Sequence, residues 1–392
     1  MIPPARTQAA IEVLDLVIAA SRDGGPPADA ILADYFRTRR YAGSGDRRAV
    51  RELVYRAIRR SGERPESGRS GVLGLAEDTP ELVAHFGAGG HAPPPIVEGE
   101  PRAPVTLAPA WIVERFAPEV GACEQDALLA RAPLDLRVNR LKADLDQARA
   151  LLPGAEPVAQ VPDGLRLPTD ARVEGTPAVR DGLVEVQDAG SQLVALACRA
   201  EPGMTVLDLC AGAGGKTLAL AASMGNEGRL IASDTDRGRL SRLPPRAARA
   251  GAHAELRLLD GGCEPEALAD LEARADAVLV DAPCSGTGTW RRNPELRWRL
   301  TPERLARLVA TQAHVLDLGA PLVRSGGTLV YAVCSLLAEE GEGAGTAFLS
   351  RHSGWIPEEP FAAGRAAGAG RILTPAHDGT DGFWVARLRR TC

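Results

Sequence analysis

The fold is decided by the stretch TVLDLCAGAGGKT at residues 205–217. A short apolar run at 205–209 leads into a glycine-rich segment, and a helical pattern follows. Glycine lets the backbone turn sharply and approach a ligand closely, and the N-terminus of a following helix offers unpaired N–H groups. The stretch therefore predicts a strand, a ligand-binding turn and a helix.

Four more apolar runs follow, at 229–233, 254–259, 277–280 and 328–333. Each ends in small or acidic residues and leads into a helical segment, and strands that alternate with helices indicate a parallel, doubly wound sheet. In such sheets ligands bind beyond the carboxyl ends of the strands, near the point where the strand order reverses. The predicted fold class is α/β and Rossmann-like, with functional residues directly after each run.

The glycine loop could serve three ligand classes, and two of them fail at single positions. A phosphate-binding P-loop needs glycine six residues before its lysine, where this chain has Cys210, and a dinucleotide fingerprint would need its third glycine at Thr217. The remaining class is the loop of S-adenosylmethionine-dependent enzymes. Asp234, about 20 residues further on, closes the second run and would take the ribose hydroxyls. Asp260 closes the third run and would lie near the adenine.

Two cysteines stand after the fourth and fifth runs, 50 residues apart. If these strands are neighbours, Cys284 and Cys334 face one cleft beside the cofactor. Methylation of carbon 5 of cytosine needs a thiolate that adds to carbon 6, a second group that assists elimination, and an acid partner at the ring nitrogen. Cys334, Cys284 and Asp281 fit these three roles in that order.

The composition is that of a soluble globular protein. The chain has 392 residues, 45% hydrophobic and 25% charged, with a net charge of -5, which argues mildly against nucleic acid as a partner. No apolar stretch approaches the roughly 20 residues that span a bilayer, and the first residues do not resemble a signal peptide. The seven cysteines have no framework spacing, which favours reduced thiols and a cytoplasmic location. Cys123, Cys198 and Cys263 are predicted to be small buried hydrophobes, and Cys210 to pack within the loop.

The local charge differs from the global charge. Residues 4–61 show the apolar spacing of a small helical bundle, and 37–60 hold nine arginines against two acidic residues. A second cluster, 291–307, holds six against two and lies beside Trp290 and Trp298. These clusters favour phosphate contacts, with base stacking on the tryptophans. The alternatives, a solvated arginine-rich surface and core tryptophans, stay open.

These motifs resemble those of the Nop/Sun (RsmB-type) family of RNA 5-methylcytosine methyltransferases. The resemblance rests on segments 186–192, 207–217, 281–295, 326–335 and 379–383, and 4–60 looks like the NusB-type RNA-binding domain of bacterial members. It implies a NusB-like all-α domain with a Gly/Pro-rich linker in 1–125 and a methyltransferase domain in 186–392. Between them, short strands at 134–138 and 165–167 around a helix at 145–152 predict a small α+β unit in 126–185.

The resemblance also implies roles for individual residues. Cys334 would be the nucleophile, Cys284 would assist product release, and the substrate would be a cytosine in RNA, with 16S ribosomal RNA expected. The family's cofactor contacts fall on Cys210, Ala211, Gly212, Ala213, Gly214, Gly215, Lys216, Asp234, Asp260 and Asp281. We expect no metal and no membrane segment, and a monomer.

Two positions depart from the family pattern. Val333 precedes Cys334 where the family often has Thr, and Gly341 replaces the Asn of the acidic motif Glu-Glu-Asn-Glu. Neither position performs the chemistry outlined above. The composition favours a functional role for Lys216, because Lys142 is the only other lysine in the chain. We expect the Lys216 ammonium to contact the cofactor or the flipped base.

Three alternatives remain at this point. A DNA cytosine methyltransferase would use Cys284 as the nucleophile. A catalytically idle RNA-binding assembly factor could keep the same fold. Within RNA methylation, transfer RNA could replace ribosomal RNA as the substrate.

Overall fold

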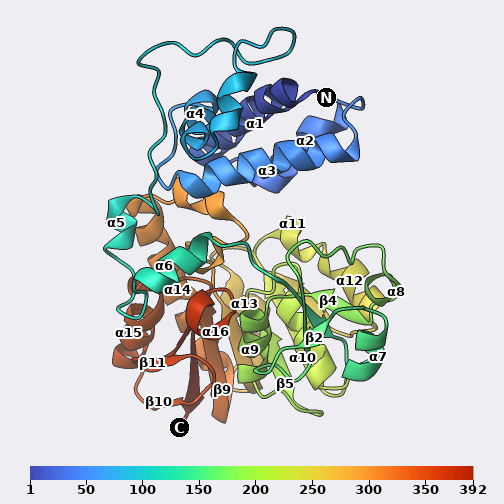
Figure 1. Cartoon of the computed structure of the whole chain (residues 1–392). Helices are drawn as coiled ribbons and strands as arrows, with labels where there is room; N and C mark the ends of the chain where they lie inside the picture. Colours follow the sequence, from blue (N-terminus) through green and yellow to red (C-terminus); the bar gives the residue numbers. More distant parts are fainter. Residues whose placement is uncertain (392) are drawn as a thin grey trace. The chain divides into compact units, whose positions relative to one another are not determined.

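The computed structural model describes residues 1–391, which divide into two compact units (Figure 1). The first unit comprises Met1–Phe116, Gln125–Ala130 and Thr289–Pro302. The second takes the remaining residues and contains both β-sheets. The two units are described separately below.

The first unit is helical, as the apolar spacing predicts. α1 begins with prolines in its first turn, where a missing N–H costs nothing, and ends at Gly24, which takes a left-handed φ of 72°. Buried faces of the long helices form one core, with Leu14 and Ile58 fully enclosed. The elements are α1 (Pro3–Asp23), α2 (Ala28–Arg37), α3 (Ser44–Arg60), α4 (Gly68–Asp78), η1 (Pro80–His85), α5 (Ala110–Val113) and η4 (Pro294–Trp298).

The segment Thr289–Pro302 packs within this helical unit. Trp298 is buried in the helical core and its indole N–H donates to the Ser61 carbonyl at 2.8 Å. Trp290 is 1% exposed and meets Phe116 edge-on. Both tryptophans are therefore core residues, and the alternative in which they stack on bases is wrong.

The basic face expected over 291–307 has fewer exposed arginines than the sequence indicates, because some of them are buried. Arg297 is fully buried and donates to the backbone carbonyls of Ile58 and Leu107, and Arg291 is 6% exposed. A guanidinium that satisfies buried carbonyls is not available to phosphates. Arg304 and Arg307, which begin the next helix, are exposed.

The smaller sheet of the second unit confirms the strands expected at 134–138 and 165–167. Its four antiparallel strands follow the order β2-β3-β1-β4, around a core that includes Leu136 and Leu165. Its elements are β1 (Leu134–Val138), α7 (Leu145–Ala150), β2 (Glu156–Pro157), β3 (Gly164–Leu167), α8 (Pro177–Arg180) and β4 (Val184–Val186). α6 (Ala122–Leu129) includes residues assigned to both units.

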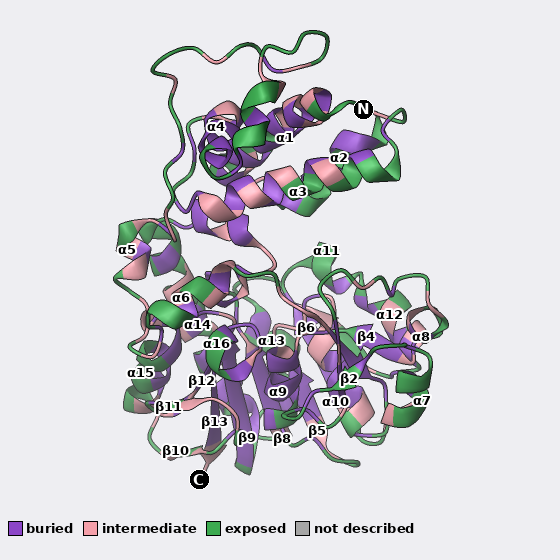
Figure 2. Cartoon of the chain, in the orientation of Figure 1, coloured by how far each residue is buried: buried purple, intermediate pink, exposed green. Residues whose placement is uncertain are grey.

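The larger sheet follows the order β11-β12-β13-β9-β8-β5-β6-β7, and β10 pairs with β13. The five predicted runs form its parallel strands: β5 (Thr205–Asp208), β6 (Arg229–Asp234), β7 (Glu255–Leu258), β8 (Ala275–Asp281) and β9 (Val323–Val333). The order reverses between β5 and β8, so the doubly wound prediction is confirmed. Figure 2 shows these central strands buried.

Antiparallel strands extend this sheet beyond β9, and the apolar runs had not revealed them. β13 pairs along most of β9 and brings Phe383 and Trp384 into the interior. The strands are β10 (Trp355–Glu358), β11 (Arg365–Ala367), β12 (Gly370–Leu373) and β13 (Phe383–Arg390). The helices are α9 (Ala189–Ala197), α10 (Gly215–Ser223), α11 (Arg237–Leu240), α12 (Leu243–Ala250), α13 (Glu264–Leu268), α14 (Pro302–Gly319), α15 (Ala344–Arg351) and α16 (Pro375–Asp378), with short turns η2 (Ala269–Leu271), η3 (Thr287–Thr289), η5 (Ala320–Leu322) and η6 (Glu339–Gly343).

Candidate active site

Two thiols meet at the carboxyl ends of neighbouring parallel strands. The register of β8 and β9 places Asp281 opposite Ala332, so the segments that follow the two strands start side by side. Cys284 and Cys334 lie on these segments, and their Sγ atoms are 3.3 Å apart. The prediction that the two cysteines face one another is therefore confirmed by the geometry.

The two thiols are not equivalent. The hydrogen bond with Cys334, together with burial, holds the pKa of Cys284 well above its ordinary value, and the negative charges of Cys334 and Glu340 act in the same direction. Either sulfur can donate in this contact, and the raised pKa favours the protonated form of Cys284.

Lys216 lies beside the thiols and pairs with Asp281. Its Nζ is 2.6 Å from Asp281 Oδ2, and its side chain is 11% exposed. Burial alone would lower the pKa of Lys216, but the charges of Asp281 and Cys334 outweigh it and the pKa is raised. The ammonium thus contributes positive charge near Cys334.

The glycine loop connects β5 to α10 and faces the end of β6. The N–H of Gly212 donates to Asp234 Oδ2 at 2.7 Å, so the predicted ribose carboxylate lies against the loop. Gly212 and Gly214 take left-handed φ values of 54° and 84°. A Cβ at Gly214 would also lie 2.2 Å from the Leu243 side chain, so both conformation and space require glycine there.

The other predicted loop residues occupy the same edge of the sheet. Ala211 N–H donates to the Ser233 carbonyl at the end of β6, and Arg246 donates to the Ala213 carbonyl. Asp260 follows β7 and is exposed. Burial raises the pKa of the Cys210 thiol far above its ordinary value, which agrees with a packing role rather than a reactive one.

Asp208, the last residue of β5, was not among the predicted site residues. It is 1% exposed and accepts a hydrogen bond from the Thr217 hydroxyl at 2.7 Å. Its Oδ1 is buried without a partner among residues 1–391. Burial raises its pKa to about 7, and the nearby carboxylates of Asp281 and Asp234 add to the effect. The signal that could have identified it is its place directly before the glycine loop.

The remaining cysteines partly contradict the burial prediction. Cys198 is 2% exposed, and burial raises its pKa to about 12. Cys123 and Cys263 are exposed, so the prediction is wrong for both. Cys263 lies in the turn before α13, and Cys123 lies in the first turn of α6, where neither side chain is drawn into a core. The six cysteines of the described part are free, and Cys392 lies outside it.

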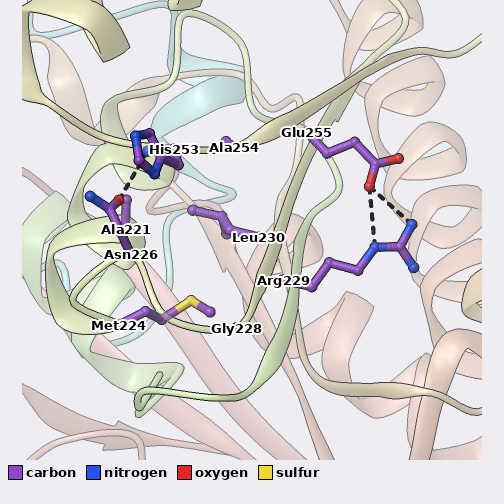
Figure 3. Close-up of a pocket in the computed structure, with 9 residues that line it drawn as sticks. All are labelled: Ala221, Met224, Asn226, Gly228, Arg229, Leu230, His253, Ala254 and Glu255. Carbon is purple, nitrogen blue, oxygen red and sulfur yellow. Dashed lines mark hydrogen bonds and ion pairs between the residues drawn. The ribbon is translucent and has the colours of Figure 1, made fainter.

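A separate pocket of about 260 Å³ lies at the other end of the strands (Figure 3). Arg229 and Glu255, the first residues of β6 and β7, form an ion pair at 2.9 Å on its wall, and His253 N–H donates to the Asn226 side chain. The pocket is thus remote from the carboxyl edge that holds the thiols.

Throughout residues 1–391 no cluster of three or more acidic, His or Cys side chains could hold a metal. No helix in that range is both long and apolar enough to cross a membrane.

Comparisons with known proteins identify similar chains. The family model for 16S rRNA methyltransferase RsmB/F matches residues 195–389. A probable ribosomal RNA small subunit methyltransferase B from Synechocystis is 36% identical over 298 residues, which are 72% of this chain and 66% of that protein. The ribosomal RNA small subunit methyltransferase B of Escherichia coli is 36% identical over 295 residues, with the same coverage. The aligned region thus spans just under two thirds of these relatives.

Solved structures share the fold over the same part of the chain or more of it. The crystal structure of PH0851 matches with a TM-score of 0.80 and 25% identity, and covers 100% of this chain and 99% of its own. A methyltransferase homologue from Pyrococcus horikoshii matches with a TM-score of 0.62 and 26% identity, and covers 72% of this chain and 94% of its own.

Proposed function

Since the chain belongs to the RsmB/F family of methyltransferases, we propose that it transfers a methyl group from S-adenosylmethionine to carbon 5 of a cytosine in RNA, with 16S ribosomal RNA as the substrate. The observation that carries the proposal is the 3.3 Å contact between Cys284 and Cys334 at the ends of adjacent strands. A reaction in which one thiol attacks the substrate and a second group assists elimination needs these two side chains in contact.

The chemistry begins at Cys334. Carbon 5 of cytosine is a poor nucleophile, and addition of the Cys334 thiolate to carbon 6 makes the ring enamine-like so that carbon 5 can attack a methyl group. The proton on carbon 5 then leaves, the ring double bond re-forms, and the Cys334 sulfur is expelled. The base must leave its stack to reach the thiol, which costs least in single-stranded or loop RNA.

Cys284 suits the release step. In the free protein the pKa of Cys284 is raised first by its hydrogen bond with Cys334 and then by burial and negative charge. Once Cys334 is bonded to carbon 6, it no longer carries charge or accepts in the same way. The hydrogen bond with Cys334 and the negative charge of Cys334 are then lost, so the pKa of Cys284 falls and its thiol releases its proton to water. The Cys284 thiolate can then take the carbon 5 proton.

Lys216 and Asp281 serve the ring nitrogen together. Negative charge builds up on the ring when sulfur adds to carbon 6, and a nearby donor stabilises it. Asp281 is paired with the Lys216 ammonium at 2.6 Å, so the proton that reaches the ring nitrogen comes from this pair. This role refines the expectation that Lys216 contacts the base.

The cofactor residues fit the proposed donor. S-adenosylmethionine supplies an electrophilic methyl group. The loop from Cys210 to Lys216 would hold it, because the left-handed φ values of Gly212 and Gly214 turn the backbone sharply at the carboxyl edge of the sheet. Asp234 would accept from the ribose hydroxyls, and Asp260 would lie at the adenine.

Trapping of a covalent adduct tests the proposal. Fluorine at carbon 5 cannot leave as a proton, so RNA with 5-fluorocytosine should stay bonded to the wild-type protein on a denaturing gel. Cys334→Ala should abolish the adduct. Cys284→Ala should form it and, with ordinary cytosine, should accumulate it, because release is impaired. Cys263→Ser, which changes an exposed thiol elsewhere, is the matched control and should behave as wild type.

Other outcomes identify the alternatives. If Cys284→Ala abolished the adduct and Cys334→Ala did not, the nucleophile would be that of DNA cytosine methyltransferases. If calorimetry detected no binding of S-adenosylmethionine, the chain would act as an RNA-binding assembly factor. Bisulfite sequencing of ribosomal and transfer RNA from a deletion strain distinguishes 16S rRNA from tRNA as the substrate.

A further inference from the structure

Glu340 is a buried carboxylate beneath the thiol pair. It lies in η6, which follows the segment of Cys334, and it is fully buried. A buried carboxylate is costly unless it is paired or well hydrogen-bonded. In the described part of the chain no lysine or arginine forms an ion pair with Glu340, so neutral donors must stabilise the charge.

Those donors come from three separate segments of the second unit. Oε1 accepts from the Ser285 N–H at 2.8 Å and from the Gln312 side chain at 2.9 Å. Oε2 accepts from the Ser285 hydroxyl and from the Ser335 hydroxyl, the latter at 2.5 Å. Each oxygen therefore has two donors, and no sequence motif in the chain had indicated this arrangement.

Both serines are direct neighbours of the thiols. Ser285 follows Cys284, and Ser335 follows Cys334. Their hydroxyls also lie 3.1 Å from each other, and Gln312 donates further to the Pro283 carbonyl on the Cys284 side. One carboxylate thus links the two cysteine segments directly, on the residue next to each sulfur.

The charge of Glu340 also acts on the thiols. The ionisable groups that face Cys284 are Tyr331 from β9, Cys334 directly after β9, and Glu340 from η6. Asp281 lies on the segment of Cys284 itself, and the Lys216 ammonium faces Cys334 from α10. The charge of Glu340 therefore acts on Cys284 and helps to raise its pKa.

We propose that Glu340 is a positioning residue that holds the segments of Cys284 and Cys334 together and places a negative charge beside the Cys284 thiol. The inference rests on the proposed function for its biological meaning. Its geometry and charge can be tested without RNA or cofactor, so its failure is distinguishable from failure of the methylation proposal.

The first test is the pH dependence of Cys284 alkylation in the free Glu340→Gln protein. Glutamine keeps the size and lets the serine hydroxyls reorient to accept, but it removes the charge. The midpoint for iodoacetamide labelling of Cys284, followed by peptide mass spectrometry, should move to lower pH by about one unit. Since glutamine fills the same space, a role in packing alone would leave this midpoint unchanged.

Glu342→Gln is the matched control, since it removes an exposed carboxylate from the same turn. Its Cys284 midpoint should stay at the wild-type value. If Glu340→Gln and Glu342→Gln titrated alike, the charge role would be wrong.

A second variant covers the case in which Glu340→Gln does not fold. Glu340→Asp keeps the charge but is one methylene too short to reach both serines. Diamide oxidation, which takes two hydrogens and joins Cys284 to Cys334, should therefore slow several-fold. An unchanged oxidation rate would overturn the positioning role.

Discussion

At the scale of single residues, Asp208 makes the stability of the protein depend on pH. Burial raises its pKa to about 7, from an ordinary value of 3.8. Between these two values the folded chain keeps a proton that the unfolded chain has lost. Stability therefore falls as pH rises through this window and levels off above about 7. The whole effect is at most about 4 kcal/mol.

Asp208→Asn should remove this dependence. The amide cannot ionise, so the difference in Tm between variant and wild type should grow in favour of the variant from about pH 5 to about pH 8. Thermal unfolding at several pH values measures it, beside Asp236→Asn, which changes an exposed carboxylate at the same edge. If both variants followed pH in the same way, burial of Asp208 would not be the cause.

At the scale of elements, the turn η6 explains one departure from the family pattern. A Cβ on Gly341 would lie 2.7 Å from Trp384 Cγ and 3.0 Å from its Cβ. These are the inner atoms of a buried side chain on β13 and cannot swing away. Gly341 therefore follows from the packing of Trp384 against the turn, and Asn would not fit this position here.

Gly341→Ala should lower stability by about 1–3 kcal/mol, because overpacking forces the turn or β13 to shift. Chemical unfolding measures the change. Gly261→Ala is the control, since nothing lies within 4 Å of a Cβ built there. Equal midpoints for the two variants would show that the turn adjusts at no cost.

At the scale of the whole molecule, the sequence predicted the strands and the meeting of the thiols because both depend on local patterns. Residues after adjacent parallel strands converge, so Cys284 and Cys334 could be paired from their positions alone. Arg297 could not be placed, since its carbonyl partners Ile58 and Leu107 are 239 and 190 residues away in the chain. The rarity of lysine pointed to Lys216, but its partner Asp281 required the structure.

Partners that lie far apart in the chain also change the expectation of which arginines bind RNA. In 37–60, ion pairs hold Arg37 to Asp34, Arg39 to Glu12, Arg51 to Asp29, and Arg60 to Glu77 and Asp78. In the second unit, α11 and the turn to α12 carry Arg237, Arg239 and Arg242, which are exposed and have no ion pair within residues 1–391. Arg239 also lies against Gly212 of the cofactor loop. Unpaired arginines beside the site are the better candidates for phosphate contacts.

We expect RNA affinity to fall steeply with salt, and each phosphate contact to contribute about 0.7 to the slope of log K against log salt. Replacing Arg237, Arg239 and Arg242 by alanine should reduce that slope by up to about 2 if all three bind phosphate. Arg229→Ala, at the opposite edge of the sheet and already paired with Glu255, is the control for a lost charge. Filter binding of a ribosomal RNA fragment over a salt series measures the slopes. A flat response in the wild type would contradict phosphate binding altogether, and an unchanged slope in the triple variant would place the contacts elsewhere, because counterion release counts only the charges that touch the RNA.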